Sequence, residues 1–286
     1  MSKFQFISGL PRAGSTLLAA LLKQNPRFHA SMTSGLGSLV NGVTQMMSPG
    51  AEVALTVEQE QREDILSGLF ESYYRRKSDK EVIFDTNRMW TSRMPLLKAL
   101  FPQSKVIACV RDIPWVMDSL ERRVRDNPYH FTRLFGPMNH GTVYSRVEML
   151  MGHDAMVGRA WSGLKEAFYG DEAGALLVVE YEYLSRMPEK VLKLVYEFIN
   201  EPWYEGHDFE NVHFDAPEFD EAMGISGLHK VRPKVEFTAR RSILPPDLFK
   251  KYEGMDFWRE MAGSKAHVIA GKREASPQSQ TVPNRV

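Results

Sequence analysis

The chain opens with a strand, a glycine-containing loop and a helix, an order that constrains its fold more than any other feature. Residues 3–8, KFQFIS, alternate and are aromatic and β-branched, which predicts a strand. The loop GLPRAGS follows, and residues 16–24, TLLAALLKQ, place four leucines on one helical face before Asn25-Pro26 ends the helix. A loop of this kind aims backbone N–H groups and the positive end of a helix at one anion.

The loop itself departs from the common nucleotide-binding pattern at one position. Gly9 to Thr16 has the spacing of G-x-x-x-x-G-K-[ST], but Ser15 stands where lysine is expected. The ammonium that would reach the outer phosphates of a triphosphate is therefore missing, and the cation is Arg12, inside the loop. This favours a donor with one 5′-phosphate joined to a sulfonate over a triphosphate held with magnesium.

The rest of the chain alternates strands with helices, which predicts an α/β fold: a P-loop-like open parallel sheet flanked by helices. Ligands of such sheets bind beyond the carboxyl ends of the strands. We expect a single domain over residues 3–262 with an irregular closing loop near its C-terminal end, followed by a mobile tail over 263–286. The predicted strands after the first are 81–85, 105–110 and 175–180, and the predicted helices are 57–77, 95–101, 113–125, 145–169 with a break near Gly152, and 188–200.

Composition excludes several classes of protein. The 36 Lys and Arg residues balance 36 Asp and Glu residues, so we expect neither nucleic acid nor a membrane as a partner. Cys109 is the only cysteine, which excludes a disulfide or a cysteine-rich zinc site within one chain, and its apolar surroundings predict burial. Without a signal peptide or a long apolar stretch, the sequence predicts a cytoplasmic protein. The sequence leaves open whether the protein forms a homodimer.

Two motifs resemble the sulfotransferase superfamily, especially its tyrosylprotein-sulfotransferase-like and bacterial branches. FISGLPRAGSTLL resembles the family's 5′-phosphosulfate loop, and VIACVRDIPWVMDSLERR supplies Arg111 at a strand end and Ser119 eight residues later. In the family this pair holds a 3′-phosphate. Arg123 lies one helical turn beyond Ser119 and can face the same group, whereas Arg122 and Arg125 are interpreted as a solvated helix face.

The resemblance extends, less specifically, from about Lys3 to Trp258. VVEYEYL is similar to the segment that places a tyrosine beside the nucleotide, and GISGLHKVRPKV is similar to the loop that closes over it. It implies 3′-phosphoadenosine 5′-phosphosulfate (PAPS) as donor, adenosine 3′,5′-bisphosphate (PAP) as product, and no metal. The implied donor-binding residues are Pro11, Arg12, Ala13, Gly14, Ser15, Thr16, Arg111, Ser119, Arg123, Tyr181, Gly227, Leu228, His229, Lys230, Val231 and Arg232.

The sequence departs from the family at the catalytic base. Cytosolic relatives place a histidine where Asn87 stands here, and the tyrosylprotein branch places a glutamate near Thr33, where this chain has no carboxylate. The remaining candidates are Asp85, His29 and His140. Arg12 is predicted to stabilise the negative charge that develops in the transition state. Arg88, Thr86 or Ser226 could take the place of a further catalytic lysine.

The sequence leaves the acceptor unidentified, with a hydroxyl compound favoured. Residues 32–50 and 127–151 are rich in Met, Phe and Tyr and are candidates for its pocket. Two other functions stay open: a P-loop kinase that uses magnesium–ATP, and a nucleotide-binding protein without catalysis. Magnesium dependence would identify the kinase, and binding of PAP without transfer to any acceptor would identify the binding protein.

Overall fold

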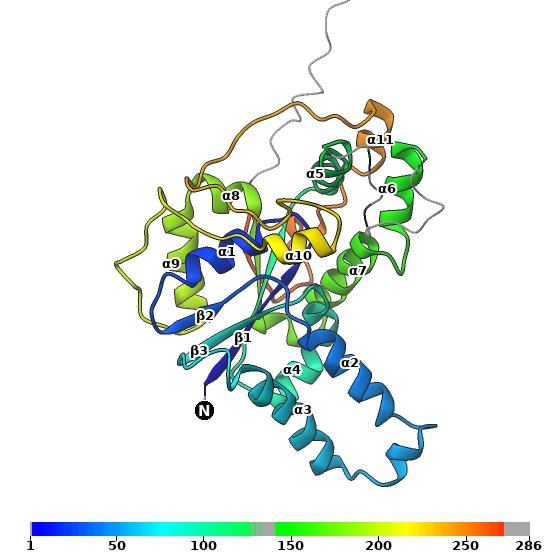
Figure 1. Cartoon of the computed structure of the whole chain (residues 1–286), viewed down its shortest axis with the longest axis vertical. Helices are drawn as coiled ribbons and strands as arrows, with labels where there is room; N and C mark the ends of the chain where they lie inside the picture. Colours follow the sequence, from blue (N-terminus) through cyan, green and yellow to red (C-terminus); the bar gives the residue numbers. More distant parts are fainter. Residues whose placement is uncertain (1, 127–128, 130–131, 133–140, 272–286) are drawn as a thin grey trace, which may run out of the picture.

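The computed structural model describes residues 2–126, 129, 132 and 141–271, and its centre is an all-parallel sheet (Figure 1). The strands lie in the order β2-β3-β1-β4-β5-β6. This confirms the predicted α/β class with an open parallel sheet. The strands are β1 (Lys3–Gly9), β2 (Phe28–Ala30), β3 (Val82–Thr86), β4 (Val106–Val110), β5 (Leu176–Glu180) and β6 (His267–Ile269).

The central strands are buried on both faces. Every residue of β3, β4 and β5 is buried, as expected for continuous apolar runs in a parallel sheet. Cys109 lies in β4 with no exposed surface, and burial raises the pKa of its thiol to about 12, so the predicted buried cysteine is confirmed. Because β1 lies between β3 and β4, the loops that follow these three strands meet at one edge of the sheet.

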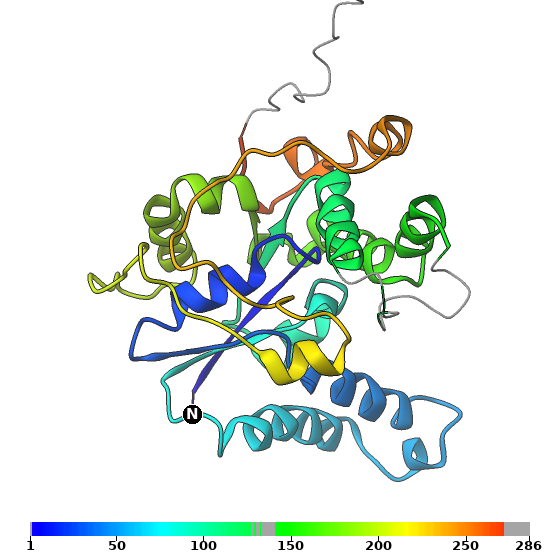
Figure 2. The same cartoon turned by 45° about the horizontal axis from the view of Figure 1, so that its top comes forward.

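Helices cover both faces of the sheet (Figure 2). Tyr196 of α9 stacks on Phe28 on one side, whereas Phe70 of α3 contacts Phe4 and Phe6 on the other. The helices are α1 (Ser15–Leu22), α2 (Leu36–Met46), α3 (Gln59–Tyr74), α4 (Met94–Leu100), α5 (Ile113–Arg125), α6 (Val143–Met151), α7 (Met156–Tyr169), α8 (Tyr181–Arg186), α9 (Pro188–Phe198), α10 (Pro217–Ala222) and α11 (Pro246–Lys251).

Several short elements differ from the sequence-based prediction. The sequence does not predict β2, α2 or α8. The three-residue strand β2 and the six-residue helix α8 are too short to produce a recognisable period, and α2 is rich in Gly, Ser and Met. Strand β6 pairs in parallel with β5, and the backbone N–H of Gly271 donates to Oε2 of Glu180 at 3.0 Å. The prediction of a tail from Gly263 is therefore wrong for residues 263–271, and residues 272–286 lie outside the described part of the chain.

Two oppositely charged stretches late in the chain run side by side. The acidic stretch, residues 205–221, has seven Asp and Glu and no Lys or Arg, and the basic stretch, residues 229–241, has five Lys and Arg against one Glu. Val212, next to the acidic residues, donates its N–H to the carbonyl of Pro233, and Val231 donates to Phe214. Lys234 forms an ion pair with Glu210 at 2.9 Å. Apart from α10, residues 205–241 have no helix or strand, and these contacts hold the basic stretch over the carboxyl edge of the sheet.

Candidate functional site

The loop between β1 and α1 turns sharply at three residues. Gly9, Arg12 and Gly14 have φ angles of 105°, 59° and 95°, in the left-handed region that favours glycine. A Cβ atom on Gly9 would collide with the carbonyl oxygen of Cys109 in β4, so only glycine fits there. Arg12 adopts this conformation although it is not glycine, which is a strained backbone typical of functional sites.

A cavity of about 300 Å³ lies at this loop and collects almost every predicted donor-binding residue. Ala13 is the exception, because its side chain is fully buried beneath the loop. The predicted residues that line the cavity are Pro11, Arg12, Gly14, Ser15, Thr16, Arg111, Ser119, Arg123, Tyr181, Gly227, Leu228, His229, Lys230, Val231 and Arg232. Four separate parts of the sequence therefore meet at this cavity: the phosphate loop, the segment from Arg111 to Arg123, Tyr181 and the closing loop.

Arg12 connects these parts. Its Nε donates to Oγ of Ser119 at 3.2 Å, and its Nη1 donates to the carbonyl oxygen of Leu228 in the closing loop. Burial, together with the charges of Arg123 and Arg111, lowers the pKa of Arg12 to about 10. Arg12 is still protonated near neutral pH, and it makes no ion pair with any described carboxylate. A bound anion would relieve this repulsion.

Arg111 is fixed from two sides at the end of β4. Its Nε lies 3.1 Å from Oε1 of Glu182, and its guanidinium lies over the ring of Tyr181 with 4.4 Å to the centroid. The same ring lies against Gly14, where an added Cβ would be 3.0 Å away. Tyr181 therefore packs between the phosphate loop and Arg111.

The charge of the cavity is strongly one-sided. Nine arginine and lysine residues line it, against the single carboxylate of Glu236. This set of arginine and lysine side chains fits a ligand with several negative charges. The nine are Arg12, Arg88, Arg111, Arg122, Arg123, Lys230, Arg232, Lys234 and Arg240.

The closing loop and the chain that follows it, residues 224–243, form a closing segment over the cavity. Sequence reasoning missed the residue that anchors the far end of this segment. Asp118, fully buried in α5, pairs with Arg122 at 3.0 Å and with Arg240 at 2.7 Å, and it accepts the backbone N–H of Ile243. Arg122 lines the cavity, so its interpretation as part of a solvated face is wrong. The available signal was a carboxylate beside Ser119 on a predicted helix, but nothing local indicated its partner at residue 240.

Asp85 does not lie in the cavity. Its side chain is fully buried, with Oδ2 accepting from the hydroxyl of Tyr74 at 2.6 Å and Oδ1 from Nε1 of Trp90 at 2.7 Å. Burial raises the pKa of this carboxyl. Asp85 therefore joins α3 to the segment after β3 and does not reach an acceptor, so its predicted catalytic role is not supported.

Two of the other predicted catalytic candidates also lie elsewhere. Ser226 is exposed and does not line the cavity, which contradicts its predicted role. His29 sits half-buried in β2 against the ring of Tyr74, and burial lowers its pKa. His140 lies outside the described residues.

One side of the cavity is formed by residues near the ends of β2 and β3 and at the start of α7. Thr33, Thr86, Asn87, Arg88 and Met156 line this side. Because β3 and β4 flank β1, it lies across the phosphate loop from Arg111. Asn87 is held in place, since Oδ1 accepts from the N–H of Met89 and Nδ2 donates to the carbonyl of Ser34. The guanidinium of Arg88 has no hydrogen-bond or ion-pair partner among the described residues.

Comparison with known proteins agrees with this geometry. The Sulfotransferase family (Sulfotransfer_3) matches residues 5–205, which is most of the chain, and the chain belongs to this family of enzymes. The family is PAPS-dependent.

Individual relatives are distant. Protein-tyrosine sulfotransferase 1 of Danio rerio is 24% identical over 211 residues, which cover 69% of this chain and 53% of the relative, so the match spans about half of that protein. The sulfotransferase domain of the curacin biosynthetic pathway superposes with a TM-score of 0.51 at 16% identity, covering 90% of this chain and 92% of that one. The sulfotransferase domain of the Synechococcus PCC 7002 olefin synthase gives 0.47 at 19% identity, with 88% of each chain covered.

Two kinds of feature are absent from residues 2–126, 129, 132 and 141–271. No group of three or more His, Cys, Asp or Glu side chains in these ranges is placed to hold a metal ion. No helix within them is long and apolar enough to cross a membrane.

Proposed function

We propose that this protein transfers the sulfuryl group of PAPS to an acceptor hydroxyl and releases PAP. The observation that carries the proposal is the placement of Arg12, inside the phosphate loop and repelled by Arg111 and Arg123. A cation at this point serves an anion bound directly against the loop. A lysine after the loop, which a triphosphate requires, is absent.

Each part of the cavity has a role in this proposal. The backbone of residues 11–16 holds the 5′-phosphate at the N-terminus of α1, while Arg111, Ser119 and Arg123 hold the 3′-phosphate. Tyr181 packs beside the nucleotide, and residues 227–232 cover it. PAPS supplies the activated sulfuryl group, and Arg12 stabilises the negative charge that develops when this group leaves.

The acceptor binds on the side of the cavity formed by Thr33, Thr86, Asn87, Arg88 and Met156. Its hydroxyl must approach in line with the bond that breaks, and this side lies across the phosphate loop from the nucleotide-binding Arg111. Arg88 is free to bind a sulfonate oxygen or the acceptor. The name of the Danio rerio relative makes a tyrosine hydroxyl the first acceptor class to test.

Thermal unfolding with two nucleotides tests the proposal. We expect PAP to stabilise the protein without magnesium by about 3–4 kcal/mol at 100 to 1,000 times its Kd, because PAP binds only the folded state. ATP at equal concentration, with or without magnesium, should give a much smaller shift. An equal or larger shift with magnesium–ATP would contradict the proposal in favour of a kinase.

A further inference from the structure

The closing loop contains a histidine that a buried carboxylate holds by two contacts. Nδ1 of His229 lies 2.6 Å from Oδ1 of Asp220, and the backbone N–H of His229 donates to Oδ2 at 2.9 Å. Asp220, in α10, has no exposed surface. A carboxylate can only accept at these distances, so Nδ1 carries the proton and Nε2 of the neutral imidazole has a free lone pair.

His229 lines the cavity next to a residue that Arg12 contacts. The carbonyl of the preceding Leu228 accepts from Nη1 of Arg12. Asp220 is also close enough to Arg12 for the two charges to interact. Nε2 of His229 has no hydrogen-bond partner among the described residues, and 15% of the side chain is exposed.

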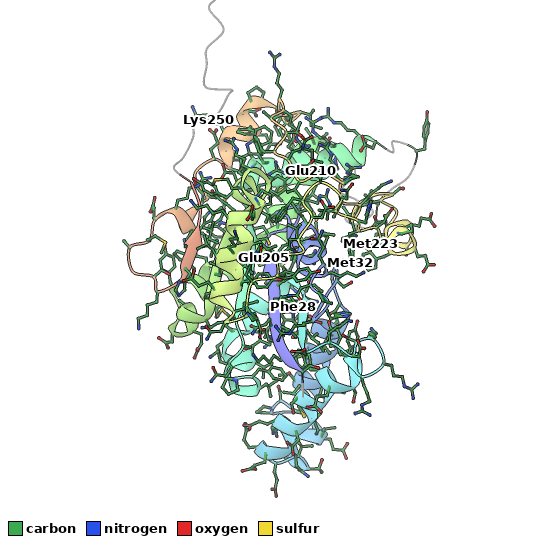
Figure 3. All side chains as sticks on the ribbon, turned by 90° about the vertical axis from the view of Figure 1, so that its left-hand side faces the viewer. Phe28, Met32, Glu205, Glu210, Met223 and Lys250 are labelled. Carbon is green, nitrogen blue, oxygen red and sulfur yellow. The ribbon has the colours of Figure 1, made fainter. Side chains whose placement is uncertain are left out.

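The anchor of His229 lies on the acceptor side. In Figures 1 and 2, α10 lies beside the segment that joins β2 to α2, which includes the cavity-lining Thr33. In Figure 3, Met223 at the end of α10 lies close to Met32 in the same segment. The imidazole is therefore attached to the wall along which the acceptor enters.

We propose that His229 is the base that removes the acceptor proton, positioned by Asp220; this inference rests on the proposed sulfotransferase function. As the acceptor oxygen bonds to sulfur, its proton moves to Nε2 of His229. The bond from sulfur to the bridging oxygen breaks, and its electron pair stays on the 5′-phosphate of PAP. The buried carboxylate stabilises the resulting imidazolium. This role accounts for Asn87 at the position where cytosolic relatives have a base.

Three charged groups lie near the imidazole. Asp220 contacts it from α10, Arg12 of the phosphate loop interacts with the charge of Asp220, and Lys230 is the next residue in the chain. Only the neutral imidazole accepts a proton, so the reaction rate should rise with pH along a limb that depends on His229.

The test uses the full-length protein and PAPS in water, with PAP formation followed chromatographically. We expect H229Q to lower the rate about 10²-fold and to abolish the limb, since base catalysis contributes that much or more. D220N should also lower the rate, but by less than H229Q, because the imidazolium loses its counter-charge while the base remains. H213Q is the matched control: His213 is exposed in the same irregular segment, and its removal should leave rate and limb unchanged.

Two measurements separate catalysis from a structural role. H229Q should bind PAP within about threefold of wild type, and added imidazole should restore part of the rate of H229A. Nitrogen NMR of histidine-labelled protein, with the signal assigned by its loss in H229Q, should show the Nδ1–H tautomer at high pH.

The outcomes are distinguishable. An active wild type whose rate and limb survive in H229Q contradicts the base assignment alone, as does an Nε2–H tautomer or a loss of PAP affinity as large as the loss of rate. A wild type that neither binds PAP nor consumes PAPS contradicts the proposed function, and the base assignment fails with it.

Discussion

At the scale of single residues, Arg12 and Arg111 serve the same ligand in different ways. Arg12 points from a strained loop to a serine and to a backbone carbonyl of the closing loop, without a carboxylate partner among the described residues. Arg111 is held by Glu182 and Tyr181 before any ligand binds. A preorganised arginine suits ground-state binding, whereas an unpaired one is available to charge that develops during the reaction.

For Arg12→Ala we expect a turnover about 10²–10³-fold below wild type, as for losses of comparable oxyanion donors. Affinity for PAP should fall by no more than about tenfold, because the loop backbone and Thr16 still hold the 5′-phosphate. Arg12→Lys should recover part of the rate, since a point charge remains. Calorimetry with PAP and chromatography of donor consumption measure the two effects. Loss of PAP binding as complete as in Arg111→Ala would make Arg12 a ground-state anchor.

Arg111→Ala should weaken PAP by about 2–4 kcal/mol, because charge-assisted hydrogen bonds to the 3′-phosphate are lost. Adenosine 5′-monophosphate lacks that phosphate, so its affinity should barely change. Calorimetric titration of both nucleotides gives the comparison. Equal losses for the two would place Arg111 elsewhere than at the 3′-phosphate.

At the scale of elements, α5 holds both the nucleotide site and the segment that closes over it. Ser119 faces the cavity, while the adjacent Asp118 binds Arg122 of its own helix and Arg240 of the closing segment. The position of the closing segment therefore depends on a buried carboxylate more than a hundred residues earlier in the chain.

Asp118→Ala should lower the free energy of unfolding by about 2–4 kcal/mol, since two half-buried arginines and the N–H of Ile243 lose their charged acceptor. It should also weaken PAP, because Arg240 and Arg122 line the cavity. Glu148→Ala is the control: its ion pair with Lys251 is exposed, so we expect a loss below about 1 kcal/mol and unchanged PAP affinity. Urea unfolding and calorimetry measure both. Similar losses in the two variants would show that Asp118 is not the anchor.

At the scale of the whole molecule, the sheet is completed by a strand close to the end of the described chain. β6 pairs with β5, and two contacts reinforce it: the N–H of Gly271 donates to Glu180, and the hydroxyl of Ser264 donates to the carbonyl of Phe168. Glu180 also accepts from Nε1 of Trp258 and from Arg259. Gly271, Trp258 and Arg259 thus all bind the buried carboxylate of Glu180.

Ending the chain after Gly263 should therefore destabilise the domain relative to a chain that ends after Gly271. The half-buried Val268 and Ile269 and the lost hydrogen bonds together account for about 2–4 kcal/mol. Thermal and urea unfolding of the two truncated proteins give the difference. Equal stabilities would show that β6 adds nothing to the sheet.

The sequence by itself determined the elements whose information is local. Helix α5 was predicted with its observed bounds, because its apolar residues recur at helical spacing and Pro114 suits a first turn. The phosphate loop, Arg111, Ser119 and Tyr181 were predicted from motifs in which strand, loop and helix are contiguous. Parallel pairing then followed, because alternating strands and helices bring the carboxyl ends of the strands to one edge.

The tertiary structure alone decided which separate segments meet. The sequence offers Asp85 as one of three candidates for the base, but packing buries it between Tyr74 and Trp90. The contacts of Asp118 with Arg240 and of Asp220 with His229 involve irregular chain, which has no period to reveal its partners. Such contacts depend on how distant segments pack over the sheet, and burial makes each carboxylate take the partner that packing supplies.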